Sequence, residues 1–448
     1  MAIYGKESIC LLFGDIVFYC SAHMLGIETA NRGLIMITKP KTVVIVGAGI
    51  VGLSTAFHLA EKGVERIVIV EKGKVGDGSS IRAGGIVTML QDNESAIRAR
   101  SRSLDIFERF SSILPGYTFH QVGCLNLMRE QDFVNSTTLR EIQTSLGARI
   151  EVLRGSEIQQ KFPDIHTTDE DFGVLDLRGG YSEPHRYIPA LLAKVRELGV
   201  EVRENQALVE FTMAGEVVTG VITRGRRSNE PETSTDVTKT IKADAVICTV
   251  NSWANHVLSG VGFNIPMKNF IHERFVTKRF PTQPILPAIN DNVKDGYVRP
   301  TDDNRLLLGT SAHNPDEFVI PHPDFTFSDL QPDPRSLTHL KEHFTNRVPL
   351  LQRTEWDYHR VGLISFAMDS NPVIGPVPGL GNFYIGVNFH SGGFGYNPVA
   401  GLLLSEYVVN GKTSVDVDSF LPDRFACVDT ESYQSMPLKH HDILQKRH

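Results

Sequence analysis

KTVVIVGAGIVG, residues 41–52, is the stretch that decides the fold. Its first half, Lys41–Val46, is an unbroken apolar run rich in β-branched residues, which is typical of a strand buried on both faces of a parallel sheet. Its second half has the form GxGxxG and leads into apolar residues at helical spacing over 51–62. A second buried strand is predicted at Arg66–Val70. Together these elements form one βαβ unit that binds a dinucleotide.

Each glycine of the motif has its own physical reason. Gly47 permits the tight turn, Gly49 lets the backbone approach a pyrophosphate, and Gly52 lets helix and strand pack closely. The helix N-terminus offers N–H groups to the phosphates. Glu71 ends the second strand 19 residues after Gly52, where a carboxylate accepts hydrogen bonds from ribose hydroxyls. The same carboxylate repels a 2′-phosphate and so disfavours NADP.

Further parallel-type strands are predicted far along the chain, at 245–250 and 383–387, and the latter precedes a helix at 397–409. Between them, 262–355 alternates short strands with Pro-rich turns, which suits an antiparallel sheet. The sequence therefore predicts an α/β plus α+β protein in which a discontinuous nucleotide-binding domain carries an inserted substrate domain. The predicted division is an N-terminal extension at 1–38, a nucleotide-binding domain at 39–120, 178–262 and 356–425, a substrate domain at 121–177 and 263–355, and a tail at 426–448.

Other local predictions are coarser. Short strands are expected at 125–128, 173–177 and 200–203, a polar helix-like stretch at 133–160, a helix at 189–198, and a solvated loop or hairpin tip at 224–240.

The bulk properties exclude several classes of protein. The 448 residues are enough for about two or three domains. A net charge of −7 argues against a nucleic-acid partner, and five cysteines without paired spacing predict neither a disulfide framework nor a metal site. The apolar run at 10–27 is interrupted by Asp15 and His23 and is too short to span a bilayer. We expect the 1–38 extension to be poorly ordered and the protein to be cytoplasmic. If the extension is a targeting peptide, the compartment would be mitochondrial.

A loop dense in Gly and Ser, GDGSSIRAGG at 76–85, follows the βαβ unit and lets a long cofactor pass the backbone. With this loop, the run at 43–87 resembles the N-terminus of the D-amino-acid oxidase-like flavoenzymes, in particular the branch of the sarcosine oxidase β-subunit, glycine oxidase and dimethylglycine dehydrogenase. The stretch 362–403 resembles the second signature of that family, with Asp369 before NPVIG and the turn HSGGF before the last helix. Blocks at 179–184 and 245–253 fall in the expected order, so that the resemblance extends over about 41–425.

The resemblance implies an FAD-binding domain of the glutathione-reductase type, and it assigns residues to the cofactor. The implied set is Gly47, Gly49, Ile50, Gly52, Glu71 and Lys72 for adenosine and pyrophosphate; Ser79, Ser80, Arg82, Ala83, Gly84 and Gly85 beside the ribityl chain and ring; Leu208 for adenine; Trp253 facing the flavin; and Gly392, Gly393 and Phe394 in the turn whose N–H groups lie near the flavin N1–C2=O edge. Reduced flavin is negatively charged at that edge, and a helix N-terminus stabilises negative charge.

The chain also departs from the family pattern. Relatives that bind FAD covalently through histidine have a Trp-His pair where this chain has Ile81-Arg82. Other relatives attach FAD through a cysteine, and this chain has no counterpart of that cysteine within 362–375. Noncovalent FAD is therefore expected. Relatives that bind a substrate carboxylate with lysine place it where this chain has Gly395.

Three residues are candidates for substrate chemistry. Arg299 either clamps a substrate carboxylate or caps the turn at Pro300, and Tyr297 shares its face of the strand. His390 at the strand-to-helix turn either accepts the amine proton, hydrogen-bonds the ring or is structural. His272, His359, Tyr181 and Arg82 are weaker candidates.

The resemblance implies oxidation of a small amine or amino acid by hydride transfer to flavin N5, giving an imine that hydrolyses. Oxygen or another acceptor would reoxidise the flavin. Three alternatives stay open: oxidation of a 2-hydroxy acid, a flavoprotein assembly factor without catalysis, and an interaction subunit. The protein would form homo- or hetero-oligomers, with no membrane span.

Overall fold

The computed structural model describes residues 8–13, 16–21, 39–225, 237–310 and 317–437. Within the predicted N-terminal extension, strands β1 (Ser8–Phe13) and β2 (Ile16–Ser21) pair as an antiparallel hairpin. The rest of 1–38, most of the predicted loop at 224–240 and the end of the tail lie outside the described residues.

A six-stranded sheet forms the centre of the nucleotide-binding part, in the order β11-β4-β3-β15-β22-β21. Five of its strands are parallel and only β21 is antiparallel. The strands are β3 (Thr42–Val46), β4 (Arg66–Val70), β11 (Glu201–Arg203), β15 (Ala245–Cys248), β21 (Val373–Pro376) and β22 (Phe383–Val387). Because segments from both ends of the chain share this sheet, the prediction of a discontinuous nucleotide-binding fold is confirmed.

Both faces of this sheet are covered, which explains its unbroken apolar strands. Helices α1 (Ile50–Glu61), α3 (Glu94–Ile113), α7 (Pro184–Glu197) and α10 (Gly393–Asn410) cover one face, with Val43 and Ile45 in their core. A meander of β12 (Gln206–Ala214), β13 (Val217–Gly225) and β14 (Val237–Lys242) covers the other, with Val44 and Val46 in its core.

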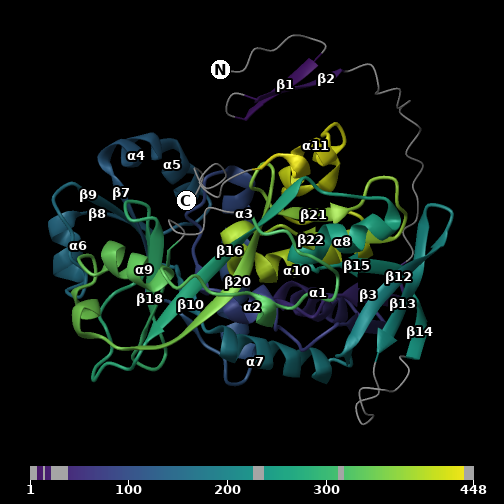
Figure 1. Ribbon diagram of the computed structural model, residues 1–448, viewed down its shortest axis with the longest axis horizontal. Coiled ribbons are helices and arrows are strands. Elements are labelled where there is room, and N and C mark those ends of the chain that lie inside the picture. The colour runs from purple at the N-terminus through teal and green to yellow at the C-terminus, as the bar shows by residue number, and fades with distance from the viewer. Residues whose placement is uncertain (1–7, 14–15, 22–38, 226–236, 311–316, 438–448) are drawn as a thin grey trace.

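An eight-stranded sheet forms the rest of the protein, in the order β20-β16-β19-β18-β17-β7-β9-β8. Its strands are β7 (Cys124–Arg129), β8 (Ile150–Arg154), β9 (Asp171–Asp176), β16 (Met267–Thr277), β17 (Ala288–Asp291), β18 (Gly296–Pro300), β19 (Leu306–Thr310) and β20 (Trp356–Ala367). In Figure 1 its β8–β9 end lies on the left and the β12–β14 meander on the right. The sheet is antiparallel as predicted except where β17 pairs with β7 in parallel.

Two local predictions were wrong. The stretch 133–160 is not one helix, because α4 (Glu130–Asn135) and α5 (Thr137–Ser145) are followed by strand β8 and helix α6 (Gly155–Lys161). Strand β20 lies within the segment 356–425 that was assigned to the nucleotide-binding domain, yet it pairs with β16 along most of its length. Both strands are joined to their sheet by long-range pairing, which local periodicity does not record.

The remaining elements are small. A three-stranded sheet orders β5 (Ile86–Val87), β10 (Gly180–Ser182) and β6 (Phe119–His120). The other helices are α2 (Ser79–Arg82), α8 (Ala254–Leu258), α9 (Ser336–Phe344) and α11 (Thr430–Ser435). Among the described residues, no helix combines the length and apolarity needed to cross a membrane.

Candidate FAD site

A large cavity of about 1080 Å³ runs between the parallel sheet and the eight-stranded sheet. Its walls bring together most of the residues predicted for the cofactor, although they come from segments far apart in the sequence. The lining includes Gly47, Gly49, Ile50, Glu71, Lys72, Ser79, Ser80, Arg82, Ala83, Gly84, Gly85, Leu208, Trp253, Gly392, Gly393 and Phe394, and also Tyr297 and His390. Gly52 and Arg299, which were predicted with them, do not line it.

The GxGxxG turn is shaped as the sequence predicts. Gly47 has a φ of +103°, which side chains rarely adopt, and a Cβ on Gly52 would lie 2.1 Å from the Gly47 carbonyl oxygen. Gly52 thus supports the turn from behind instead of contacting a ligand. The first turn of α1 holds no acidic residue, and Ser80 Oγ accepts a hydrogen bond from Ile50 N at 3.1 Å. A pyrophosphate at this helix N-terminus would therefore meet no negatively charged side chain in that turn.

The Glu71 carboxylate lies at the end of β4, on the cavity wall. It accepts hydrogen bonds from Ala48 N at 2.8 Å and Gly73 N at 2.9 Å. Burial raises its pKa, while these two bonds and the charge of Lys72 act in the opposite sense. Each carboxylate oxygen uses one lone pair in this way and keeps a second lone pair, to which a ribose hydroxyl can donate.

Lys72 and Trp253 form the wall next to Glu71. Burial lowers the pKa of Lys72 to about 8, and its Nζ donates to the carbonyl oxygens of Pro323 and Phe325, both at 2.7 Å. The same ammonium lies 4.0 Å from the Trp253 ring centre, and that ring stacks on Phe327. Trp253, which was expected to face the flavin, therefore contacts Lys72, a residue predicted for the adenosine end. Its Nε1 is buried and has no hydrogen-bond acceptor among the described residues. An oxygen-rich ligand could supply that acceptor.

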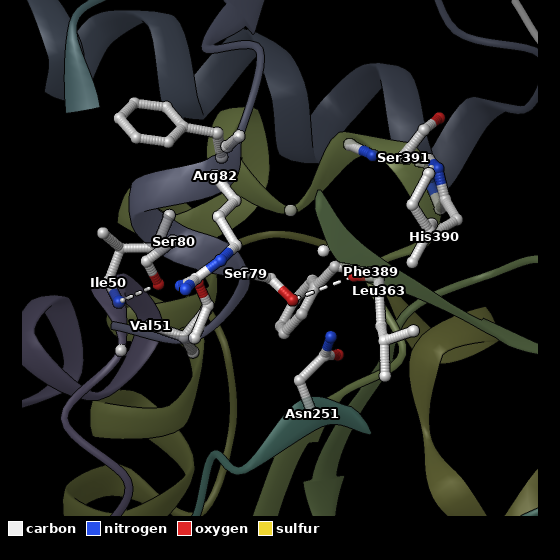
Figure 2. Close-up of a pocket in the computed structure, with 18 of the residues that line it drawn as sticks. Ile50, Val51, Ser79, Ser80, Arg82, Asn251, Leu363, Phe389, His390 and Ser391 are labelled. Atoms are coloured by element: carbon white, nitrogen blue, oxygen red, sulfur yellow. Dashed lines mark hydrogen bonds between the residues drawn. The ribbon is translucent and has the colours of Figure 1, made fainter. Parts of the chain in front are cut away.

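The glycine- and serine-rich segment forms the middle of the cavity. Ser79 Oγ donates to the Leu363 carbonyl at 2.9 Å (Figure 2), and Cζ of Arg82 lies 5.3 Å from the ring centre of Phe327. Arg82 pairs with Asp77 at 3.2 Å and donates to the Gly78 carbonyl at 3.0 Å. Burial lowers its pKa, and the charge of Asp77 opposes this.

The turn before α10 closes the other end. His390 has a φ of +43°, and its Nδ1 accepts a hydrogen bond from Gly392 N at 3.2 Å. The first turn of α10 holds no acidic residue. Asn251, which the sequence did not single out, faces the cavity beside this turn in Figure 2, and its Oδ1 accepts from Asn388 N at 2.9 Å. Asp369 accepts hydrogen bonds from Arg424 and from Asn371 N, and so holds the turn that precedes β21.

Tyr297 and Arg299 share one face of β18, as the period of two predicts, but only Tyr297 reaches the cavity. A Cβ on Gly84 would lie 2.9 Å from the Tyr297 ring, so this glycine makes room for it. The Tyr297 hydroxyl lies 3.1 Å from His272 Nε2, and both residues line the cavity.

The prediction that Arg299 clamps a substrate carboxylate was wrong. Arg299 is fully buried and forms two hydrogen bonds with Glu183, at 2.6 and 3.1 Å. It also donates to the carbonyl oxygens of Gly84 and Pro300. Its donors are used within the protein, because the fold brings Glu183 from a distant segment.

The weaker candidates fall into two groups. Tyr181 and His359 do not line the cavity, whereas His272 does. The sequence also missed Arg100, which lines the cavity from the buried face of α3. The sequence signal that could have found it is an arginine at an apolar position of an amphipathic helix. Among the described residues, no cluster of His, Cys, Asp or Glu could hold a metal ion.

Comparison with known proteins agrees with this geometry. The chain is 25% identical to 4-methylaminobutanoate oxidase (formaldehyde-forming) of Paenarthrobacter nicotinovorans over 390 residues, which is 86% of this chain and 45% of that protein. The chain thus spans about half the length of that relative. It is also 25% identical to sarcosine oxidase subunit beta of an Arthrobacter species over 403 residues, covering 86% of this chain and 91% of that one.

Among solved structures, L-proline dehydrogenase from P. horikoshii superimposes with a TM-score of 0.76 at 25% identity, covering 87% of this chain and 98% of that one. The DAO family, described as FAD dependent oxidoreductase, matches residues 42–407. The resemblance deduced from the sequence is confirmed. The chain belongs to the DAO family of FAD-dependent oxidoreductases.

Proposed function

We propose that this protein uses noncovalently bound FAD to oxidise a small amine or amino acid, such as an N-methyl or other secondary amine or a glycine-like compound. The observation that carries the proposal is the continuous cavity, which joins the GxGxxG turn and Glu71 to Tyr297 and His272 on the eight-stranded sheet. A cofactor held at the GxGxxG turn and Glu71 would reach a substrate held at Tyr297 and His272. FAD bound there would accept a hydride at N5 from the C–H beside the substrate nitrogen.

The residues present fit FAD. The GxGxxG turn and the N-terminus of α1 would hold the pyrophosphate, and Glu71 would accept the ribose hydroxyls. The Gly- and Ser-rich segment at 76–85 supplies a wall with little side-chain bulk for the ribityl chain. The N-terminus of α10 would stabilise negative charge at the N1–C2=O edge. No cysteine is among the described residues that line the cavity, which supports noncovalent binding.

On the substrate side, we assign positioning to Tyr297 and His272, because their hydrogen bond fixes both groups at the cavity wall. His390 is a poor acceptor for the amine proton, since the Nδ1 lone pair already accepts from Gly392 N. Hydride transfer needs an amine that arrives unprotonated and is correctly oriented more than it needs a strong base. The imine product would then hydrolyse in water.

The names of the relatives support the substrate class. Those proteins are named for 4-methylaminobutanoate, sarcosine and L-proline. Each of these compounds carries a secondary amine and a carboxylate.

The test is an anaerobic absorption spectrum of the FAD-loaded protein before and after addition of N-methyl amines, D- and L-amino acids and 2-hydroxy acids. We expect the flavin band near about 450 nm to bleach with one class of amine. Bleaching by 2-hydroxy acids alone would contradict the proposal in favour of hydroxy-acid oxidation. A flavin that no compound bleaches would favour an assembly factor or a subunit that needs a partner.

A further inference from the structure

Arg100 is a buried cation on the wall of the cavity. It projects from the middle of α3, and only 2% of its surface is exposed to solvent. Its Nε donates to the Thr88 carbonyl and its Nη1 to the Gly392 carbonyl, both at 3.0 Å. Its Cζ lies 4.7 Å from the ring centre of Tyr396. These contacts hold the guanidinium beside the 390–394 turn without neutralising it.

Gly395 is what admits this side chain. A Cβ on Gly395 would lie 1.6 Å from Nη1 of Arg100 and 2.6 Å from Nη2. The guanidinium therefore occupies the place where any side chain of residue 395 would begin. The sequence shows only that residue 395 is not lysine, whereas the fold brings the cation of Arg100 from α3 to the position next to Gly395.

No carboxylate of the described residues forms an ion pair with Arg100, although other buried arginines have one. Arg299 pairs with Glu183 at 2.6 Å, and Arg347 pairs with Asp171 at 2.8 Å and Asp291 at 2.7 Å. Burial lowers the pKa of Arg100, and electrostatic interaction with Tyr396, Cys124 and Asp176 acts in the opposite sense.

Among the described residues, Asp176 forms no direct hydrogen bond or ion pair with Arg100. Its carboxylate already accepts hydrogen bonds from Thr88 Oγ1 and from the backbone N–H groups of Met89 and Arg178. Arg274 likewise bonds only to carbonyl oxygens, but it does not line the cavity. A buried charge without a counter-ion is unfavourable, and a cavity beside it offers the room for one.

The position of Arg100 indicates which anion would bind. Cys124 and Asp176 belong to β7 and β9 of the eight-stranded sheet. Nη2 of Arg100 has no hydrogen-bond acceptor among the described residues, and it belongs to a side chain that lines the cavity. Thr88, whose carbonyl accepts from Arg100 Nε, also donates through Oγ1 to Asp176 of β9, so the guanidinium lies where the eight-stranded sheet meets the 390–394 turn. We propose that Arg100 binds the carboxylate of the substrate through Nη2, so that the site selects an amino acid over an amine without a carboxylate.

This inference rests on the proposed function and can be tested without turnover. The probes are pyrrole-2-carboxylate and the neutral pyrrole-2-carboxamide, whose dissociation constants are measured from the perturbation of the flavin spectrum. We expect the wild-type protein to prefer the carboxylate. Arg100→Gln should weaken carboxylate binding about 10- to 100-fold, as loss of a hydrogen bond between charged groups does, and leave the carboxamide unchanged. Arg100→Lys should restore part of the affinity.

A second variant displaces the guanidinium without removing its charge. Gly395→Ala places a methyl group on Nη1 and should weaken carboxylate binding in the same sense. The matched control is Arg98→Gln, because Arg98 is an exposed residue of α3 that pairs with Glu94. It should change neither constant. FAD content and melting temperature show whether each variant is folded.

Several results would overturn the inference. One is a wild-type protein with no preference for the carboxylate over the carboxamide. Another is an Arg100→Gln variant with unchanged carboxylate binding. If that variant instead lowers the midpoint potential of the flavin, then Arg100 serves the negative edge of the reduced cofactor. Failure of every amine to bleach the flavin would refute the proposed function but would not alter the ratio of the two constants.

Discussion

Arg299 and Glu183 form a bidentate ion pair beneath the glycine-rich loop, with Nη1–Oε1 at 2.6 Å and Nη2–Oε2 at 3.1 Å. Because Nε of the same guanidinium donates to the Gly84 carbonyl, the pair ties strand β18 to the loop that lines the cavity. Tyr297, two residues earlier on the strand, is thereby placed against Gly84. The arginine that sequence reasoning assigned to the substrate instead positions the tyrosine that lines the cavity.

Breaking this pair on one side should destabilise the protein strongly. Arg299→Gln or Glu183→Gln should lower the free energy of unfolding by about 3–5 kcal/mol, because each leaves the other charge buried without its partner. Denaturant unfolding of the FAD-loaded protein measures this. The double variant with methionine at both positions should lose less than the sum of the single variants. Arg98→Gln, which breaks an exposed pair, should cost about 1 kcal/mol or less.

The same pair predicts a pH dependence. Burial raises the pKa of Glu183, but the charge and hydrogen bonds of Arg299 outweigh it and hold the pKa below the ordinary carboxyl value. A carboxyl whose pKa is lower in the folded state stabilises the fold above its unfolded pKa, which is about 4.3, and loses this contribution as the pH falls through the folded pKa. The melting temperatures of wild type and Glu183→Gln should therefore differ most at neutral pH and converge in acid. A difference that stays constant down to about pH 3 would contradict this assignment.

Gly52→Ala should weaken FAD binding although the residue does not line the cavity. The new Cβ would collide with the Gly47 carbonyl, so the turn must move. Overpacking costs about 1–3 kcal/mol, which corresponds to roughly 5- to 150-fold in the dissociation constant of FAD. Fluorescence titration of the apoprotein measures it. Gly260→Ala is the control, since nothing lies within 4 Å of its Cβ. Equal FAD affinity in the two variants would show that Gly52 does not support the FAD site.

Unfolding should release FAD into solution. The histidines that line the cavity are His256, His272 and His390, and neither Ile81 nor Arg82 can attach the flavin as a histidine at that position does. Acid precipitation followed by absorption of the supernatant measures the released fraction, which should account for nearly all of the bound flavin. A precipitate that stays yellow, or a fluorescent band on a denaturing gel, would show a covalent bond.

Tyr297→Phe should retain FAD and lose part of its activity. The hydroxyl forms a hydrogen bond with His272, and a bond of this kind contributes about 0.5–1.5 kcal/mol. We expect kcat/KM for the substrate found in the anaerobic screen to fall about 2- to 13-fold. Steady-state kinetics and flavin content measure the two quantities. Unchanged kinetics would place the substrate elsewhere in the cavity, and lost flavin would assign Tyr297 to cofactor binding.

The sequence by itself determined the βαβ unit. Strand β4 occupies Arg66–Val70 as predicted, and α1 differs from the prediction by one residue at each end. Local patterns suffice there, because a buried parallel strand must be apolar throughout and the GxGxxG turn needs its glycines wherever it occurs. The family followed from several such local blocks in order along the chain.

The tertiary structure alone decided the pairing of distant side chains. Arg299 and Glu183 are 116 residues apart, and Arg100 and Gly392 are 292 apart, so no periodicity links them. A buried arginine needs hydrogen-bond acceptors and is favoured by a counter-charge, and which segments supply them depends on how the sheets assemble. The same sequence pattern therefore permitted Arg299 to face a substrate, whereas the fold gave it Glu183 and left Arg100 on the cavity wall.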